Sequence, residues 1–260
     1  MNNVSGASPQ ALTGPEGDAA LQQLMARCPL LAFDLDGTLA PIVSRPGDAR
    51  VPQALAHRLA RLARLRPVVV VTGRRVADAR GRLGFEPAAL IGSHGAEDEQ
   101  DQAASARFRA VLDPLRDHLQ HQRQSLESAG VQVEDKGQSI ALHYRMARDR
   151  DEAAAWIRTL LAPIDAPLTL SFGKCVVNVT PAHAPDKGAA LKRLVAMEGA
   201  AAAVFLGDDV NDESAFAVAE RHWLTVRVGN PAMRSAAHYF LDDHAQVAVL
   251  LQDMIDLLSG

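Results

Sequence analysis

Short apolar runs that alternate with amphipathic helical stretches, from Leu30 onward, are the feature that most constrains the fold of this 260-residue chain. Leu30–Phe33, Val68–Val71 and Ala203–Leu206 contain only apolar residues. Runs of this kind are typical of strands that are buried on both faces. The stretch that Pro52 opens repeats leucines at helical spacing. The pattern predicts strand–helix–strand units around a parallel sheet.

Residues 98–181 follow a different pattern. We expect one long polar helix first, then strands around 131–133 and 139–144, a helix near 153–161, and strands over 168–172 and 175–179. This order predicts an antiparallel sheet with helices on one face. We therefore predict an inserted domain at 98–181 and a core domain made of 23–97 and 182–260. Residues 1–22, which lack periodicity and are rich in small and polar residues, are predicted to be a disordered tail.

The charge balance limits the partners. A formal net charge of −4 gives no long-range attraction to nucleic acid or to an anionic membrane, so neither is an expected partner. The chain has no apolar stretch long enough to span a bilayer and no basic-then-apolar signal pattern at its start. We expect a cytoplasmic protein, and a monomer.

Two aspartates directly follow the first apolar run, in the segment Asp34–Leu35–Asp36–Gly37. Open parallel sheets present their ligand sites at the carboxyl ends of their strands. Residues two apart on an extended chain share a face, and a glycine lets the backbone turn. Asp34 could then act as a nucleophile beside Asp36 as a proton donor, with both carboxylates near one metal ion. A plain Asp–Gly turn is the alternative that this segment alone leaves open.

Two further segments carry weaker signals. Thr72 and Gly73 follow the valine run, where the hydroxyl and nearby amides could hold a phosphate oxygen at the start of a helix. Lys187 begins a helix after the inserted domain, where its charge could neutralise a phosphate and an attacking aspartate. Taken separately, a Thr–Gly turn and a solvated surface lysine remain open explanations.

The third apolar run ends in the densest acidic cluster, Asp208–Asp209–Val210–Asn211–Asp212. Neighbouring carboxylates need a compensating cation, and oxygen ligands favour a hard divalent ion. Mg²⁺ suits a site that also receives phosphate. Each signal stands at the same end of a predicted parallel strand, which makes a chance coincidence improbable. The joint pattern predicts a magnesium-dependent site for phosphoryl chemistry.

Together and in this order, the four motifs resemble those of the haloacid dehalogenase superfamily, whose members are mostly phosphohydrolases. The likeness covers Leu30 to the C-terminus. It implies an α/β protein with a Rossmann-like parallel-sheet core and an inserted α+β cap domain for substrate specificity. It implies a nucleophile at Asp34, a general acid and base at Asp36, and phosphate-holding residues at Thr72 and Lys187. The implied Mg²⁺ ligands are Asp34, Asp36 and Asp208, supported by Asp209 and Asp212.

Four further runs resemble the trehalose-6-phosphate phosphatase family: Gly92–Glu97, His143–Arg145, Gly173–Val177, and Gly207–Asp209 with Asp212–Glu213. The resemblance implies hydrolysis of trehalose 6-phosphate through an aspartyl-phosphate, as a step of trehalose biosynthesis. The implied substrate-binding residues are Arg74, His94, Glu134, Lys136, Arg145, Lys174 and Asn178. The chain departs from the family where Asn178 replaces a usual glutamate and Asn211 a usual threonine. Asn178 keeps hydrogen-bonding ability but carries no charge.

Two other functions remain open. Asn178 motivates a phosphatase of another sugar phosphate, of the glucosylglycerate or sucrose type. A sugar-phosphate sensor without turnover is the alternative from a different class, and the intact pair of Asp34 and Asp36 disfavours it.

Overall fold

The computed structural model describes residues 9–173, 175–230 and 232–260. They fall into two compact units, one made of the residues up to Gly95 together with Pro185–Gly260, the other of Ala96–Ala184. These divisions differ by two and three residues from the boundaries expected at 97/98 and 181/182. The second unit is therefore an insertion in the sequence of the first.

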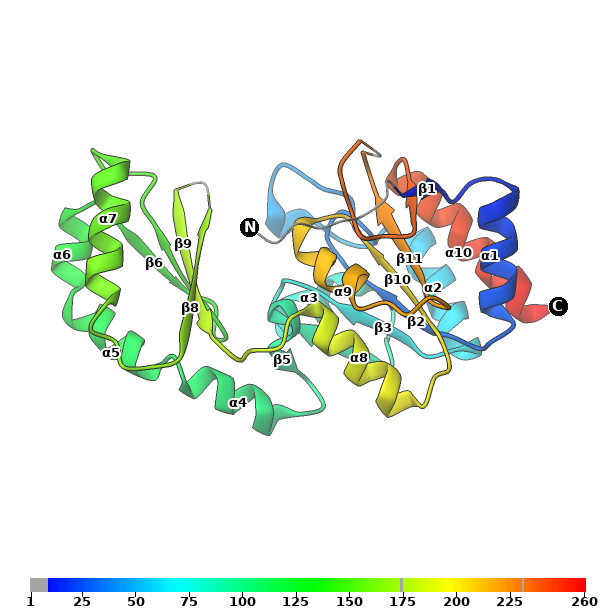
Figure 1. Ribbon diagram of the computed structural model, residues 1–260, viewed down its shortest axis with the longest axis horizontal. Helices are drawn as coiled ribbons and strands as arrows, with labels where there is room; N and C mark the ends of the chain where they lie inside the picture. The colour runs from blue at the N-terminus through cyan, green and yellow to red at the C-terminus, as the bar shows by residue number, and fades with distance from the viewer. Residues whose placement is uncertain (1–8, 174, 231) are drawn as a thin grey trace. The chain divides into compact units, whose positions relative to one another are not determined.

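A parallel sheet forms the centre of the first unit (Figure 1). Within this unit the strands lie in the order β1-β12-β11-β10-β2-β3-β4, and the neighbouring pairs are parallel. All residues of β2, β3 and β10 are buried, and the predicted α/β class with a parallel sheet is confirmed. The strands are β1 (Gln10–Ala11), β2 (Leu30–Phe33), β3 (Val68–Val71), β4 (Ala89–Gly92), β10 (Ala203–Gly207), β11 (Leu224–Val228) and β12 (Tyr239–Leu241).

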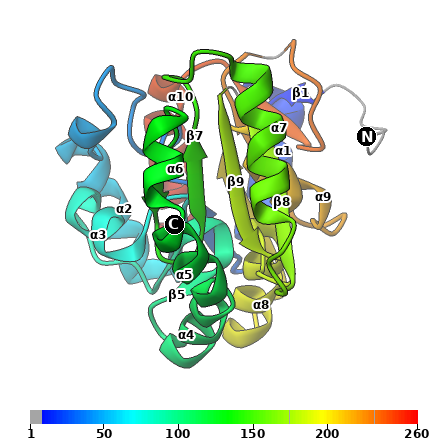
Figure 2. The same cartoon turned by 90° about the vertical axis from the view of Figure 1, so that its left-hand side faces the viewer.

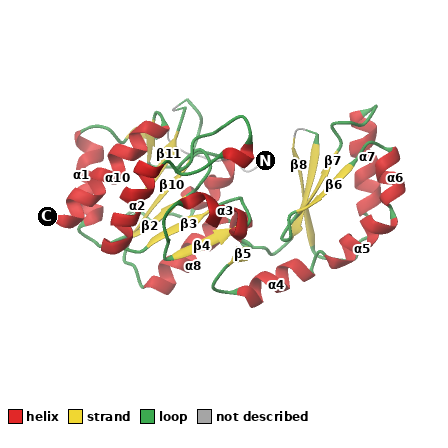
Figure 3. Cartoon of the chain, turned by 180° about the vertical axis from the view of Figure 1, so that it is seen from behind, coloured by secondary structure: helices red, strands yellow, loops and turns green. Residues whose placement is uncertain are grey.

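Helices cover both faces of this sheet. One face carries α1 (Pro15–Met25), α2 (Gln53–Leu65) and α10 (His244–Ser259), as Figure 3 shows. The other carries α8 (Lys187–Glu198) and α9 (Glu213–Ala217), which lie in front of the sheet in Figure 1. The remaining elements are α3 (Val76–Leu83) and the 3-10 turns η1 (Pro46–Asp48), η2 (Ser93–Gly95) and η3 (Val210–Asp212). Among the described residues, no helix combines the length and the apolar character that crossing a bilayer requires.

The tail predicted over residues 1–22 is wrong for its described part. Gln10 pairs with Tyr239 as β1 joins the sheet beside β12, and α1 follows. Leu12, Leu21 and Leu24 are buried in the core of the unit. The composition argument failed because the apolar surface that orders this segment comes from distant parts of the chain, β12 and α10. Residues 1–8 lie outside the described residues.

The second unit contains an antiparallel sheet with strands in the order β6-β7-β9-β8. Helices α5 to α7 pack on one of its faces through buried residues such as Leu115, Leu126 and Ile157 (Figure 2). The predicted antiparallel sheet with helices on one face is confirmed. The elements are β5 (Glu97–Asp98), α4 (Gln102–Ala110), α5 (Asp113–His121), α6 (Arg123–Ser128), β6 (Gln132–Asp135), β7 (Ile140–His143), α7 (Arg150–Leu161), β8 (Leu168–Gly173) and β9 (Val176–Pro181).

The single long polar helix expected at the start of this unit is instead three helices. α4 ends at Ala110, and α5 begins at Asp113 with Pro114 in its first turn. Proline has no backbone N–H to donate to the preceding turn, so a continuous helix cannot pass through it without a break. Gln122 separates α5 from α6. Pro114 is the residue in the sequence that marks this break.

Candidate active site

The predicted catalytic segments meet at one edge of the first unit's sheet. β2 pairs in parallel with β10 and with β3, with Phe33 opposite Leu206 on one side and opposite Val70 on the other. Asp34 follows β2 and Thr72 follows β3. Because parallel strands end on the same side, the residues after them are brought together at the carboxyl edge of the sheet.

Lys187 joins two buried carboxylates at this edge. Its Nζ lies 2.8 Å from Asp34 Oδ1 and 2.6 Å from Asp212 Oδ1. Its position is fixed by the start of α8, where the Asp186 side chain accepts a hydrogen bond from the Ala189 amide. Burial raises the pKa of Asp34 to about 7 against the attraction of Lys187. Burial alone would lower the pKa of Lys187, but Asp34 and Asp212 outweigh it and raise that pKa.

Asp208 completes the acidic group. One carboxylate oxygen from each of Asp34, Asp208 and Asp212 lies within 4.8 Å of the others. Gly37, at φ +78°, makes this approach possible, because a Cβ there would stand 2.0 Å from Asp208 Oδ2. Among the described residues, nothing donates a hydrogen bond to the buried Asp208 Oδ1. Burial, followed by the charges of Asp212 and Asp209, raises the pKa of Asp208 to about 7.

These residues fit a magnesium ion. Three carboxylates face one ammonium, so two negative charges remain when all four groups are ionised. A divalent cation would balance them, and the unpartnered Asp208 Oδ1 is a carboxylate oxygen of the kind that Mg²⁺ prefers. Asp212 Oδ2 already accepts the amides of Asp208 and Asp209. Asp208 is thus the acid of the group best placed to bind an ion, and Asp212 shapes the loop around it.

Asp209 and Asn211 make hydrogen bonds within their own loop. The Asp209 side chain accepts hydrogen bonds from the Val210 amide and from Asn211 Nδ2, and it caps η3. Neither residue belongs to the acidic group. Asp209 is therefore a cap that shapes the loop before Asp212, and its expected support of the metal site stays a prediction.

Asp36 is not placed as the sequence argument expected, because its carboxylate is outside the acidic group formed with Asp34 and Asp208. It makes a two-fold contact with Arg74, at 2.6 Å from Nε to Oδ2 and 2.7 Å from Nη2 to Oδ1. Arg74 also contacts Asp78 at 2.8 Å. The argument relied on an extended chain through Asp36, but β2 ends at Phe33 and the side-chain alternation ends with it.

Thr72 lies beside the predicted substrate residue His94. Thr72 is fully buried, its Oγ1 accepts the Arg74 amide at 3.2 Å, and its carbonyl accepts the His94 amide at 3.0 Å. The hydroxyl keeps its own proton for a further acceptor. A Cβ on Gly73 would stand 2.4 Å from the His94 ring, which explains the glycine after Thr72.

Predicted sugar-binding residues gather on one face of the second unit's sheet. Glu134 lies across from Ala141, which lies across from Asn178, so their side chains share a face. It is the face away from the buried cluster under α5 to α7. Glu134 Oε2 lies 3.0 Å from His143 Nε2 and 3.6 Å from Lys136 Nζ. Arg145 is exposed two residues beyond β7, and Lys174 lies outside the described residues.

Arg227 is a site residue that the sequence argument missed. It is 4% exposed, and its Nη2 donates to the carbonyl oxygen of Asp208 at 2.8 Å. Its Nη1 donates to Glu213 Oε1 at 2.8 Å, and Ser235 Oγ donates to the same oxygen at 2.7 Å. The available signal was a single arginine inside the otherwise uncharged strand β11, since charged residues are rarely fully buried without a partner.

Comparison with known sequences gives a consistent result. A family model described as trehalose-phosphatase matches residues 32–245. A trehalose-phosphate phosphatase of Mycobacterium bovis is 36% identical over 243 residues, which cover 86% of this chain and 61% of the relative. One of Mycobacterium avium is 34% identical and covers all of this chain and 68% of the relative. The chain thus spans about three fifths of the length of the curated relatives it matches first.

Solved structures share the fold. A trehalose-6-phosphate phosphatase of Aspergillus fumigatus superposes with a TM-score of 0.72 at 23% identity, covering 95% of this chain and 99% of that one. A sucrose-phosphatase of Synechocystis, solved with sucrose and phosphate, gives 0.56 at 21% identity, covering 88% and 98%. At these identities the likeness is one of fold.

Proposed function

The chain belongs to the trehalose-phosphatase family, and we propose that it hydrolyses trehalose 6-phosphate to trehalose and phosphate with Mg²⁺ as its cofactor. The observation that carries the chemistry is the buried contact of 2.8 Å between Lys187 and Asp34 at the carboxyl edge of the sheet. A carboxylate that is held beside an ammonium and next to further acids is suited to attack phosphorus.

In the first step, a carboxylate oxygen of Asp34 forms a bond to phosphorus while the bond from phosphorus to the sugar oxygen breaks. Lys187 offsets the charge that collects on the transferring phosphoryl group, and the Thr72 hydroxyl donates to one of its oxygens. Asp36 gives a proton to the departing sugar oxygen. The product on the enzyme is an aspartyl-phosphate at Asp34.

In the second step, water attacks the aspartyl-phosphate, Asp36 takes a proton from that water, and Asp34 is released with inorganic phosphate. A two-fold pair with arginine involves the carboxylate form of an acid, which is the form that accepts this proton. For the first step Asp36 must leave Arg74. A phosphate next to Arg74 would compete for the guanidinium and so help to free Asp36.

Mg²⁺ would be held by Asp34 and Asp208, in the loop that Asp212 shapes, and would stabilise negative charge on the transferring oxygens. Lys187 neutralises only part of the negative charge of the acidic group. The remaining negative charge would attract the cation. The side chain of Asp36 does not belong to this acidic group. In this proposal Asp36 therefore transfers protons, and other carboxylates bind the metal ion.

For the sugar, the proposal assigns recognition to the face that carries Glu134, Lys136 and Asn178. Carboxylate, ammonium and amide groups on one face match the hydroxyls of a disaccharide. Arg145 and Lys174 belong to the same proposal, as do His94 and Arg74 in the first unit. Asn178 favours one second candidate, a phosphatase of sucrose phosphate or glucosylglycerate phosphate, because an amide cannot form the charge-assisted bonds of a carboxylate.

A panel of phosphosugars tests the proposal. Phosphate release is measured from trehalose 6-phosphate, sucrose 6-phosphate, glucosylglycerate phosphate and glucose 6-phosphate, with Mg²⁺ or with a chelator. We expect kcat/KM for trehalose 6-phosphate to exceed the others by at least about tenfold, and the chelator to abolish turnover until Mg²⁺ is added back. Equal rates for the four sugars would reject the substrate. No turnover with any of them in Mg²⁺ would reject the phosphatase.

The proposal also includes a monomeric, cytoplasmic enzyme that acts without nucleic acid. Light scattering behind a sizing column should give the mass of one chain, at the same concentration that is used in the assay. A dimer mass at that concentration would reject the monomer.

A further inference from the structure

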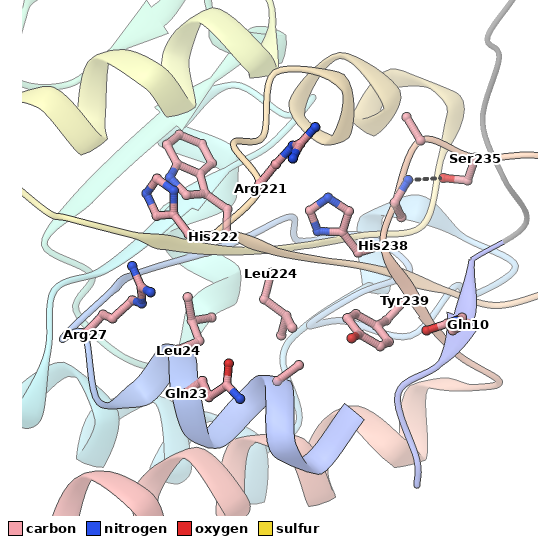
Figure 4. A pocket seen from close by; sticks show the side chains of 14 residues that line it. Gln10, Gln23, Leu24, Arg27, Arg221, His222, Leu224, Ser235, His238 and Tyr239 are labelled. Atoms are coloured by element: carbon pink, nitrogen blue, oxygen red, sulfur yellow. Dashed lines mark hydrogen bonds between the residues drawn. The ribbon is translucent and has the colours of Figure 1, made fainter. Parts of the chain in front are cut away.

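A pocket with a volume of about 600 Å³ lies on the first unit (Figure 4). Gln10, Leu224 and Tyr239 line it, and they are the first residues of β1, β11 and β12. Asp34 instead follows the last residue of β2. Because these strands are parallel, the pocket and the catalytic residues occupy opposite edges of the sheet. Its volume is within the usual range for small-molecule sites.

Basic side chains rim this pocket. Arg27, Arg221, His222 and His238 line it from the end of α1 and from the loops before β11 and β12, as Figure 4 shows. No lining residue is acidic, although the whole chain has 31 aspartates and glutamates against 27 lysines and arginines. Two arginines and two histidines with no acid among the lining residues, in a chain of net charge −4, indicate a site for an anion.

The two arginines are available to a ligand. In the described part of the chain, no carboxylate forms an ion pair with Arg27 or Arg221. The acid next to the rim, Glu220, lies 3.7 Å from His222 Nε2. A guanidinium offers parallel N–H groups that match the oxygens of a phosphate.

The wall of the pocket is already fixed in place. Ser235, which is 1% exposed, donates from Oγ to Glu213 Oε1 at 2.7 Å, and the Ala236 amide donates to Glu213 Oε2 at 2.8 Å. The Ala237 amide donates to Ser235 Oγ, the dashed line in Figure 4. A preformed wall lowers the ordering cost of binding.

Apolar groups complete the lining. Leu24 and Leu224 are buried beneath it, and Tyr239 is half-buried beside them. An inorganic anion would make no contact with this apolar surface. A phosphate attached to an organic group would use both parts of the lining.

We propose that this pocket binds a small organic phosphate, with its phosphate at the basic rim and its organic group against Leu24 and Tyr239. The site is separate from the proposed catalytic residues and independent of their chemistry. No covalent step takes place there.

Trp223 lines the pocket, and the only other tryptophan of the chain is Trp156 in the second unit. In a Trp156→Phe background, fluorescence therefore reports on this pocket alone. The probes are adenosine 5′-monophosphate and ribose 5-phosphate, with adenosine and ribose as uncharged controls. We expect a saturable change of Trp223 emission with the phosphates below about 1 mM, and none with the controls.

Arg27→Gln combined with Arg221→Gln should weaken the binding of both phosphates by at least about tenfold. Arg61→Gln combined with Arg64→Gln removes the same charge from exposed positions on α2 and should leave the affinity unchanged. Circular dichroism is used to check that each variant is folded. The proposal is overturned by no saturation with either phosphate at about 10 mM, by equal affinity in the Arg27 and Arg221 variant, or by equal binding of adenosine. None of these readings depends on phosphatase turnover.

Discussion

The catalytic edge of the first unit and the polar face of the second unit's sheet hold their charges in opposite ways. At the edge, Lys187 is 2% exposed and lies within 2.8 Å of both of its carboxylate partners. On the sheet face, the side chains of Lys136 and Glu134 are 44% and 54% exposed and stand 3.6 Å apart. Buried charges must be paired, whereas exposed pairs contribute at most about 1 kcal/mol. The side chains at the catalytic edge are therefore held in place before substrate binds. The side chains on the sheet face can change position when substrate binds.

The largest expected effect belongs to Asp34. Asp34→Asn keeps the shape of the side chain but removes the nucleophile, so kcat should fall by about 10⁴-fold or more. Phosphate release under saturating trehalose 6-phosphate measures it. Asp209→Asn is the matched control, because it changes an aspartate of the same edge that caps η3 and should retain most activity. Undiminished turnover in Asp34→Asn would exclude Asp34 as the nucleophile.

Lys187→Met tests the difference between the buried edge and the exposed face by its effect on the free energy of unfolding. It leaves Asp34 and Asp212 buried without their ammonium, which should cost about 3–5 kcal/mol in the free energy of unfolding by urea. Lys136→Met, on the exposed face, should change it by less than about 1 kcal/mol. Both are measured in chelator, so that no metal ion replaces the lost charge. Similar losses in the two variants would show that the two regions do not differ as we describe.

The stability loss in Lys187→Met has a predicted pH dependence. A carboxyl whose folded pKa is raised loses stability as pH rises through that pKa, and the pKa of Asp34 is already raised to about 7. Without Lys187 the carboxyl is still harder to ionise. The gap between wild type and Lys187→Met should therefore widen from about pH 6 to about pH 8. A gap that narrows over this range would contradict the assigned role of Lys187.

A smaller effect should follow from Glu213→Gln. The charge of Glu213 holds Arg227, which in turn donates to the carbonyl oxygen of Asp208. Loosening this support should lower activity by about tenfold and raise the Mg²⁺ concentration needed for half-maximal rate, while saturating Mg²⁺ restores part of it. Glu220→Gln changes a nearby exposed glutamate and serves as the control. An unchanged Mg²⁺ requirement would mean that Arg227 does not position Asp208.

Sequence patterns predicted the fold and the meeting of the candidate catalytic segments at one edge of the sheet, because apolar runs such as Val68–Val71 need burial on both faces and parallel strands end together. They did not predict side-chain partners. Asp36 was expected beside Asp34, but it pairs with Arg74 from a different strand end. Such a contact depends on the register of β2 against β3, which local spacing does not contain.

The N-terminal segment and Arg227 failed for a related reason. Composition alone predicted a disordered tail over residues 1–22. In the described part of that segment, Leu12 and Leu21 are buried by elements more than two hundred residues later in the chain, β12 and α10. Arg227 was passed over because its partner Glu213 lies on another element. Tertiary contacts of this kind decide which charged residues are structural and which are available to a ligand.

Glu134→Gln should have the smallest effect and tests the exposed side of the comparison. The hydrogen bond from His143 holds the pKa of Glu134 below its ordinary value, so the change removes a charge that is present at neutral pH and keeps the shape. We expect KM for trehalose 6-phosphate to rise by about three- to tenfold, with kcat nearly unchanged. The free energy of unfolding by urea should change by less than about 0.5 kcal/mol. Glu127→Gln, an exposed acid on α6, is the control for charge alone. A fall in kcat with unchanged KM would mean that Glu134 acts on the chemical step rather than on the sugar, and the division of labour between edge and face would not hold.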